Sequence, residues 1–223
     1  MRIRTSNICI ENQRAWIVPG NISGIVEIDL HTGRSAMVAA FNGHGMFESL
    51  TCGAIRKNGD CIAVAPLRGE DLYLFYFSTG KVVRHSLGSY LKGANIGRGA
   101  AKFYDSFSRG KNIYFIGCGW PAVIKIDVET QLIKVIELNI KRQAAYYEDI
   151  LGRAAGIFGE KVFIPVCFDN SFAIFDLAED TYEIQKLGSY CCIGACCGHN
   201  AMCLLPIQGG QIEIYDIQEK KIS

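Results

Sequence analysis

The residues best suited to chemistry crowd near the C-terminus, where half of the chain's ten cysteines fall between positions 191 and 203. They are Cys191, Cys192, Cys196, Cys197 and Cys203, with His199 among them. Thiolates and imidazole are ligands that zinc prefers, so this cluster is the strongest candidate for a metal site in the sequence. It contains no Cys-x-x-Cys pair, the spacing typical of such sites.

The cluster also has a structural interpretation, which we favour. Cys192 lies at the same repeat position as Cys52, because each precedes a proline, Pro206 or Pro66, by fourteen residues (206 − 192 and 66 − 52). The first strand of a repeat requires small apolar side chains there, and reduced thiols meet that need. We therefore expect no bound metal, no cofactor and no disulfide framework.

Other catalytic motifs are absent from the sequence. It has no Gly-x-Ser-x-Gly elbow and no His-Glu-x-x-His motif, and the glycine-rich stretch 93–102 lacks the Gly-Lys-Ser/Thr ending of a phosphate-binding loop. No spacing singles out a carboxylate pair for glycoside hydrolysis. The innermost strands expected at 50–55, 103–107 and 154–158 contribute only Asp105 to a central channel. The sequence thus assigns no catalytic residue.

Composition and charge exclude several classes of protein. The 223 residues are 49% hydrophobic and 20% charged, which is enough apolar content for a large folded core. A formal net charge of +1 offers no electrostatic excess for nucleic acid or an anionic membrane. No apolar run approaches the ~18 residues of a membrane-spanning helix, and the first residues lack the apolar core of a signal peptide. We expect a cytoplasmic protein that binds neither nucleic acid nor membrane.

A repeat runs through the whole chain. Each copy is a short apolar strand ending near Pro or Gly, a turn, and a second apolar strand ending near Asp or Tyr. The paired anchors are Pro19 and Asp29, Pro66 and Tyr76, Gly117 and Asp127, Pro165 and Asp176, and Pro206 and Asp216. They are ten residues apart in every copy except the fourth, where they are eleven apart (176 − 165). Such regularity predicts a fold built from repeated units.

The repeated unit is predicted to be a four-stranded antiparallel sheet with minimal helix. Turn signals such as Asn58-Gly59 separate the apolar runs. The runs 72–77 and 113–116 are apolar at every position, so both faces of these strands must be covered. Stacked four-stranded sheets with a period of about 47 residues are the blades of a β-propeller. We predict one all-β domain, residues 1–223, with a β-sandwich or irregular β fold as the alternative. Its five blades are expected at about 1–41, 47–88, 100–139, 152–188 and 189–223.

One turn carries a resemblance to known families. Asp29-Leu30-His31-Thr32-Gly33 resembles the Asp-x-x-Thr-Gly turn of quinoprotein-like and lactonase-like β-propellers. The segment 113–138 is similar in its spacing of apolar residues to the repeats of surface-layer and lactonase-like propellers. The resemblance covers nearly the whole chain at the level of architecture. It implies a propeller fold, and it assigns no catalytic residue.

Ligand binding is expected on the face where the inter-blade loops meet the hairpins between second and third strands. Aromatic residues and charges of both signs on this face suit a peptide or glycan, although the aromatic rings can instead pack under their own loops. The candidate ligand-binding residues are Phe47, Glu48, Arg68, Glu70, Asp71, Trp120, Tyr146, Tyr147, Glu148 and Asp169. We predict a binding or scaffolding module for a protein, peptide or glycan, with a lactonase-like hydrolase or lyase as the alternative.

The strand count predicts an incomplete ring. The fifth repeat ends just past its second anchor turn, and no strand is left over at the N-terminus to complete it. An open ring exposes an unpaired strand edge and a blade face, which favour self-association. We therefore expect dimers or larger species in light scattering, and better behaviour when one or two blades are appended. A monodisperse monomer that unfolds cooperatively would show instead that five blades close a ring, which is the alternative.

Overall fold

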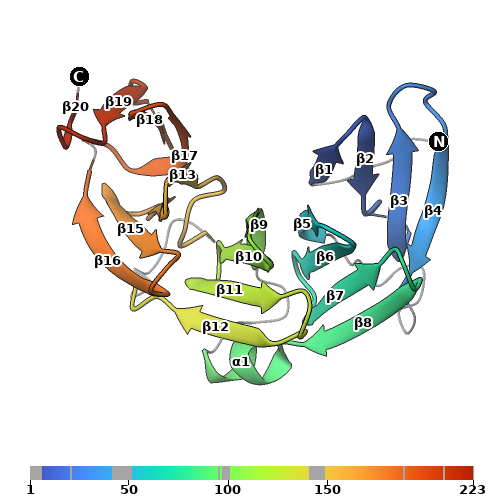
Figure 1. Cartoon of the computed structure of the whole chain (residues 1–223). Helices are drawn as coiled ribbons and strands as arrows, with labels where there is room; N and C mark the ends of the chain where they lie inside the picture. The colour runs from blue at the N-terminus through green and yellow to red at the C-terminus, as the bar shows by residue number, and fades with distance from the viewer. Residues whose placement is uncertain are drawn as a thin grey trace. The chain divides into compact units, whose positions relative to one another are not determined.

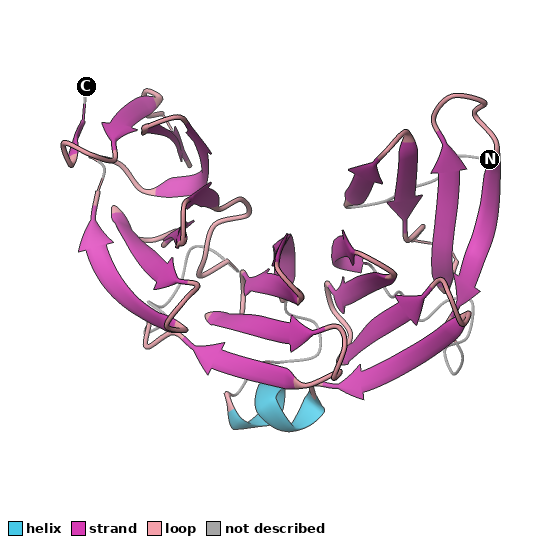
Figure 2. Ribbon diagram, viewed as in Figure 1, coloured by secondary structure: helices cyan, strands magenta, loops and turns pink. Residues whose placement is uncertain are grey.

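The computed structural model describes residues 7–20, 22–41, 52–94, 96, 101–140, 149–187, 189–207 and 209–222. β-strands dominate these residues (Figure 2), so the predicted all-β class is confirmed. The one helix among them is the six-residue α1 (Gly88–Gly93), in a segment expected to be an inter-blade loop. No helix in the described part of the chain has the length and apolar character needed to cross a membrane.

Within these ranges the strands form five antiparallel sheets, each made of four consecutive strands (Figure 1). The first contains β1 (Ile8–Glu11), β2 (Arg14–Ile17), β3 (Gly24–Asp29) and β4 (Ser35–Ala40). The second contains β5 (Cys52–Asn58), β6 (Cys61–Pro66), β7 (Asp71–Tyr76) and β8 (Lys81–Ser86). The third contains β9 (Phe103–Arg109), β10 (Asn112–Gly117), β11 (Ala122–Asp127) and β12 (Ile133–Glu137).

The last two sheets follow the same order. The fourth contains β13 (Gly156–Phe158), β14 (Lys161–Pro165), β15 (Ser171–Asp176) and β16 (Thr181–Lys186). The fifth contains β17 (Cys192–Gly198), β18 (Ala201–Pro206), β19 (Glu213–Asp216) and β20 (Lys221–Ile222). Each of the five sheets falls within one predicted blade.

The chain forms two compact units. Unit 1 comprises residues 1–115 and 124–135, and includes the first two sheets and most of the third. Unit 2 comprises residues 116–123 and 136–223, and includes the fourth and fifth sheets and the remaining end of the third. The single domain, the incomplete ring and the resulting self-association stay predictions.

Tight turns join the first and second strands, as predicted. Gly59, Gly110 and Gly159 have φ angles of +57°, +53° and +59°, and His199 has a φ of +47°. Two-residue hairpins that match the twist of the strands require a positive φ, which glycine adopts without strain. His199 therefore takes the place of these glycines in the corresponding turn of the fifth sheet.

A β-bulge in the innermost strand confirms the equivalence of two cysteines. Cys52 pairs with Pro66 and Cys192 with Pro206, and in both strands the register shifts immediately after the cysteine. Both residues are only 2% exposed. Burial raises the pKa of the Cys52 thiol to about 12 and that of Cys192 to about 11. These thiols therefore stay protonated and pack as small apolar side chains.

Aspartates at the second anchors build the turns that follow the third strands. In Asp29, Asp127, Asp176 and Asp216, Oδ1 accepts hydrogen bonds from the backbone N–H groups two and three residues ahead, at 2.8–3.2 Å. This Asx-turn geometry explains why the anchor recurs. A hydrogen bond from the Lys111 ammonium, followed by these backbone bonds, lowers the pKa of Asp127 to about 2.

The second sheet builds the same turn differently. Tyr76 stands at the anchor, and its hydroxyl donates a hydrogen bond to the carbonyl oxygen of Val128 at 2.8 Å. The turn carboxylate comes from Asp60 in the adjacent hairpin, whose Oδ1 accepts the Ser78 N–H at 2.8 Å. A carboxylate therefore holds this turn even where the repeat lacks its aspartate.

Both faces of β7 and β10 are buried, as their uninterrupted apolar runs predict. In β7, Leu72, Tyr73, Leu74 and Phe75 are 0–4% exposed. Within unit 1, one core cluster joins the first and second sheets, and within unit 2 another joins the fourth and fifth. Each fully buried side chain of this size contributes about 1.5–3 kcal/mol, so stacking of neighbouring sheets dominates their stability.

The innermost strand of the fourth sheet is shorter than predicted. The sequence predicts a strand over 154–158, whereas β13 spans only Gly156–Phe158. Ala154 instead forms a parallel bridge to Gly194 of β17. The residues just before β13 therefore pair with the fifth sheet. Apolar periodicity does not predict this pairing, because the two partners lie far apart in the sequence.

Gly117 ends β10 where the chain leaves no room for a side chain. A Cβ there would overlap the carbonyl oxygen of Trp120 and lie 2.9 Å from that of Ala122. We expect Gly117→Ala to lower the free energy of unfolding by about 2–3 kcal/mol, because backbone atoms must move. Gly93→Ala is the control, since a Cβ there meets nothing within 4 Å. Urea unfolding measures the free energy of unfolding of both variants. Equal losses in Gly117→Ala and Gly93→Ala would contradict the close backbone approach at Gly117.

Candidate functional site

The inter-blade segment 149–155, part of the predicted loop face, is held by backbone hydrogen bonds. The N–H of Ile150 donates to the carbonyl oxygen of Cys118 at 2.7 Å, and the N–H of Arg153 donates to that of Ile193 at 2.7 Å. These partners lie after β10 and in β17, all within unit 2. Backbone hydrogen bonds at both ends therefore hold the segment in place.

An ion pair sits on this segment. Nε of Arg153 donates to Oδ2 of Asp149 at 2.8 Å. The Asp149 side chain is only 8% exposed, whereas that of Arg153 is 55% exposed. A buried carboxylate requires a charged partner, so this pair positions an accessible guanidinium on a fixed segment. Both residues lie in a loop of the predicted binding face, but the sequence does not predict their pairing, because a four-residue spacing predicts an ion pair only on a helix.

Two buried thiols lie near this pair. Burial first, and then the negative charge of Asp149, raise the pKa of both Cys118 and Cys167 to about 12. Nucleophilic attack by cysteine requires the thiolate. Neither thiol is therefore a nucleophile at neutral pH, and both fill the core.

The hairpin between β6 and β7 carries three predicted site residues with different surroundings. The Asp71 side chain is 7% exposed, and its carboxylate lies 2.9 Å from the guanidinium of Arg84. This ion pair joins β7 to β8 within the second sheet. Glu70 is half-buried, and Arg68 is exposed. The carbonyl oxygen of Arg68 accepts a hydrogen bond from the buried Lys102 ammonium at 3.0 Å, which fixes the hairpin backbone. Of the three, Arg68 is the one open to a ligand.

Trp120 and Asp169 lie in the corresponding hairpins of the third and fourth sheets. Trp120 is 1% exposed, so its ring packs inside the protein and offers no face for stacking on a ligand, unlike its predicted role. Asp169 is half-buried, and its buried Oδ1 has no hydrogen-bond partner among the described residues. An unpaired buried acceptor is costly, and a ligand donor would relieve that cost.

The remaining predicted site residues are Phe47, Glu48, Tyr146, Tyr147 and Glu148. All five lie outside the described residues. Their roles stay predictions, as does ligand binding by Arg68, Glu70 and Asp169.

A hollow of about 500 Å³ lies at the other end of the strands, within unit 1. It is lined by Asn58, Gly59, Asp60, Cys61, Tyr76, Gly110, Lys111, Val128 and Glu129. Nδ2 of Asn58 donates to the carbonyl oxygen of Gly110 at 2.9 Å, and Nζ of Lys111 lies 2.7 Å from Oδ2 of Asp127. The polar groups of this hollow thus hold neighbouring turns together.

Metal-ligating residues are dispersed in the part of the chain that the structure describes. There, no group of three or more His, Cys, Asp or Glu side chains is arranged to hold a metal ion. The expectations that the C-terminal cysteine cluster binds no metal and that the protein has no cofactor stay predictions.

No protein-family model matches the chain, and no curated protein matches its sequence. Solved structures are similar in fold. A streptogramin B lyase is 11% identical with a TM-score of 0.66, over 97% of this chain and 66% of that one. A computationally designed protein is 13% identical with a TM-score of 0.64, over 97% and 59%. The extracellular domain assigned to a one-component system of B. thetaiotaomicron is 13% identical with a TM-score of 0.65, over 95% and 27%.

These similarities establish the architecture. Together with the five four-stranded antiparallel sheets, they show that the chain has a β-propeller fold. The chain spans less than two thirds of the designed protein and about a quarter of the extracellular domain. At such low identities the likeness concerns the fold alone.

We expect the contributions of Asp149 and Arg153 to the free energy of unfolding to be strongly coupled. Arg153→Ala should lower the free energy of unfolding by about 2–3 kcal/mol, because it leaves a buried carboxylate unpaired. Asp149→Ala should lower the free energy of unfolding by less than Arg153→Ala does. The loss in the double variant should be about 1–2 kcal/mol smaller than the sum of the losses in the two single variants. Urea unfolding of all three variants completes the cycle.

Lys221→Ala is the control for this cycle. Lys221 pairs with Glu219, and the two side chains are 65% and 58% exposed. Its loss should change stability by less than about 0.5 kcal/mol. Additive effects of the Asp149 and Arg153 substitutions would contradict the coupling.

Proposed function

We propose that this chain is a non-catalytic binding or scaffolding β-propeller that recognises a protein, peptide or glycan. The proposed surface is the face of inter-blade loops and of hairpins between second and third strands. The observation that carries the proposal is the guanidinium of Arg153, 55% exposed yet held by the buried Asp149 on a segment fixed by backbone hydrogen bonds. A preorganised cation loses little conformational entropy when it binds an anionic group.

Two further residues on this face support the proposal, each within its own unit. Arg68 is exposed on a hairpin whose backbone is fixed by the Lys102 ammonium. Asp169 has a buried Oδ1 that lacks a hydrogen-bond partner among the described residues. Cations and a free acceptor suit a ligand with carboxylates and N–H or O–H donors, as acidic peptides and glycans have. At the other end of the strands, the anchor aspartates instead hold their own turns.

A hydrolase or lyase is the second candidate, because a streptogramin B lyase is among the similar structures. The proposal favours binding over catalysis for a chemical reason. The Cys118 and Cys167 thiols stay protonated at neutral pH, and Asp149 is engaged by Arg153.

The proposal is tested with arrays of synthetic acidic peptides and of glycans, followed by calorimetry on the strongest probe. For a probe bound by unit 2, Arg153→Ala should weaken binding at least about tenfold, because a charge-assisted contact is lost. For a probe bound by unit 1, Arg68→Ala should have the same effect for the same reason. The matched controls are Lys161→Ala and Arg34→Ala, exposed cations at the turn end of the strands. They should change affinity less than about twofold. Equal losses from both sets, or turnover of lactones by the purified chain, would contradict the proposal.

A further inference from the structure

The two faces of the fifth sheet carry different cysteines. Across the hairpin of β17 and β18, Cys196 lies directly opposite Cys203, and Cys197 lies directly opposite Met202. Successive side chains of a strand point to opposite faces. Cys197 and Met202 pack into the core cluster shared with the fourth sheet. Cys196 and Cys203 therefore share the other face, away from that cluster.

The distance between these two residues suits a covalent bridge. Residues directly opposite each other on antiparallel strands have Cα atoms about 4.5–5.5 Å apart. This lies within the span of about 4.4–6.8 Å between the Cα atoms of disulfide-bonded cysteines. The tight turn at His199, with its φ of +47°, fixes the register that places the cysteines opposite each other. The thiols also interact: after burial, the Cys196 thiol is the group that raises the pKa of Cys203.

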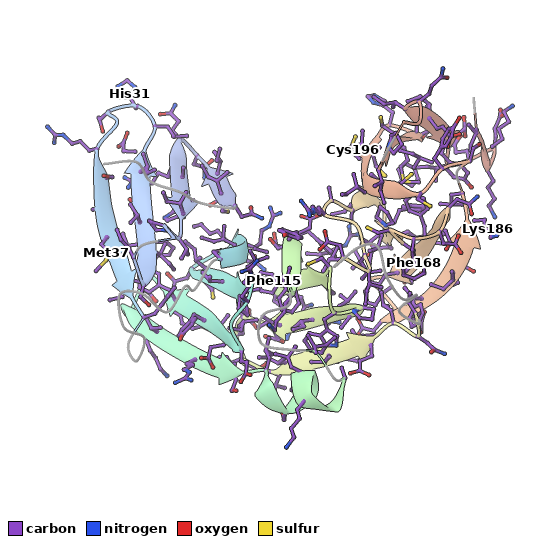
Figure 3. All side chains as sticks on the ribbon, turned by 180° about the vertical axis from the view of Figure 1, so that it is seen from behind. His31, Met37, Phe115, Phe168, Lys186 and Cys196 are labelled. Atoms are coloured by element: carbon purple, nitrogen blue, oxygen red, sulfur yellow. The ribbon has the colours of Figure 1, made fainter. Side chains whose placement is uncertain are left out.

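Accessibility distinguishes Cys196 from the other cysteines, and all ten lie in the described part of the chain. Cys191 and Cys197 are partly exposed, as Cys203 is. Cys196 is exposed and Cys203 is partly exposed, whereas Cys9, Cys52, Cys61, Cys118, Cys167 and Cys192 are buried. Cys196 lies on the ribbon of the fifth sheet (Figure 3). A small oxidant in solution can therefore reach Cys196, and its product lies beside Cys203.

We propose that Cys196 and Cys203 form a reversible cross-strand disulfide on exposure to a peroxide. The Cys196 thiolate attacks one peroxide oxygen and the O–O bond breaks, giving a sulfenic acid and one water after proton transfer. The Cys203 sulfur then attacks the Cys196 sulfur and displaces the second water, forming the S–S bond. Two thiols and one hydrogen peroxide thus give one disulfide and two waters. Two electrons pass from sulfur to the peroxide.

The bridge changes the surface around it. Cys203 lies opposite Ile214 of β19, which is 40% exposed, so the cysteine pair borders an exposed apolar side chain. Oxidation removes two thiol hydrogens from this face and ties β17 to β18 near their turn. An exposed disulfide is open to attack by other thiols, so reducing agents restore the original face.

The experiment treats the reduced full chain with hydrogen peroxide and blocks remaining thiols with iodoacetamide. Before the thiols are blocked, we expect the intact mass of the oxidised chain to be about 2 Da below that of the reduced chain. We also expect a cross-linked peptide that joins Cys196 to Cys203 and disappears with dithiothreitol. Cys196→Ser and Cys203→Ser should each abolish this species. Cys197→Ser is the matched control and should retain it, because Cys197 lies on the same strand but faces the core cluster.

Circular dichroism checks that each variant is folded, and the exposed Cys196→Ser decides the outcome if Cys203→Ser fails to fold. Retention of the mass loss in Cys196→Ser would overturn the proposal, as would its disappearance in Cys197→Ser. Chains linked to each other on a non-reducing gel would also overturn it. The proposal would also be overturned if Cys196 were oxidised to a sulfinic acid while the Cys203 thiol remained free to react with iodoacetamide.

Discussion

The need to cover both faces of strands such as β7 governs this structure. In β7 four successive side chains, from Leu72 to Phe75, are 0–4% exposed, so neither face of the strand can meet water. A single four-stranded sheet cannot bury two apolar faces by itself. The first and second sheets share one core cluster, and the fourth and fifth share another. Sheet-on-sheet stacking is therefore the interaction on which the blades depend.

Stacking uses the faces of the sheets and leaves the strand ends for other roles. At one end, the polar groups of the short hairpins and Asx turns form hydrogen bonds within the turns themselves. Asp60 performs this role in the second sheet, where Tyr76 replaces the anchor aspartate. At the other end, the chain must travel from one sheet to the next. The segment at 149–155 is anchored there by backbone hydrogen bonds, and it carries the Asp149–Arg153 pair. This division explains why the proposed binding residues lie at the loop end.

The candidate site was less predictable than the fold. Asp71 and Trp120 lie in the hairpins where a propeller is expected to bind ligands, yet Asp71 pairs with Arg84 and Trp120 is buried. Whether a hairpin side chain turns outward or inward depends on the neighbouring loops, which lie far away in the sequence. The pairing of Arg153 with Asp149 could not be predicted for the same reason, because it depends on how the connecting segment is placed.

The strand pattern, the anchor spacing and the turn positions could be predicted from the sequence alone. Each depends on residues within about ten positions of one another, where alternation, glycine conformation and Asx turns act locally. Thus the shared register of Cys52 and Cys192, and the hairpin turn at Asn58-Gly59, agree with the structure. Only the tertiary structure decided which hairpin residues are buried, which charges pair, and which face of the fifth sheet carries Cys196 and Cys203. These features depend on packing between sheets, and local patterns do not encode which side chains meet across that distance.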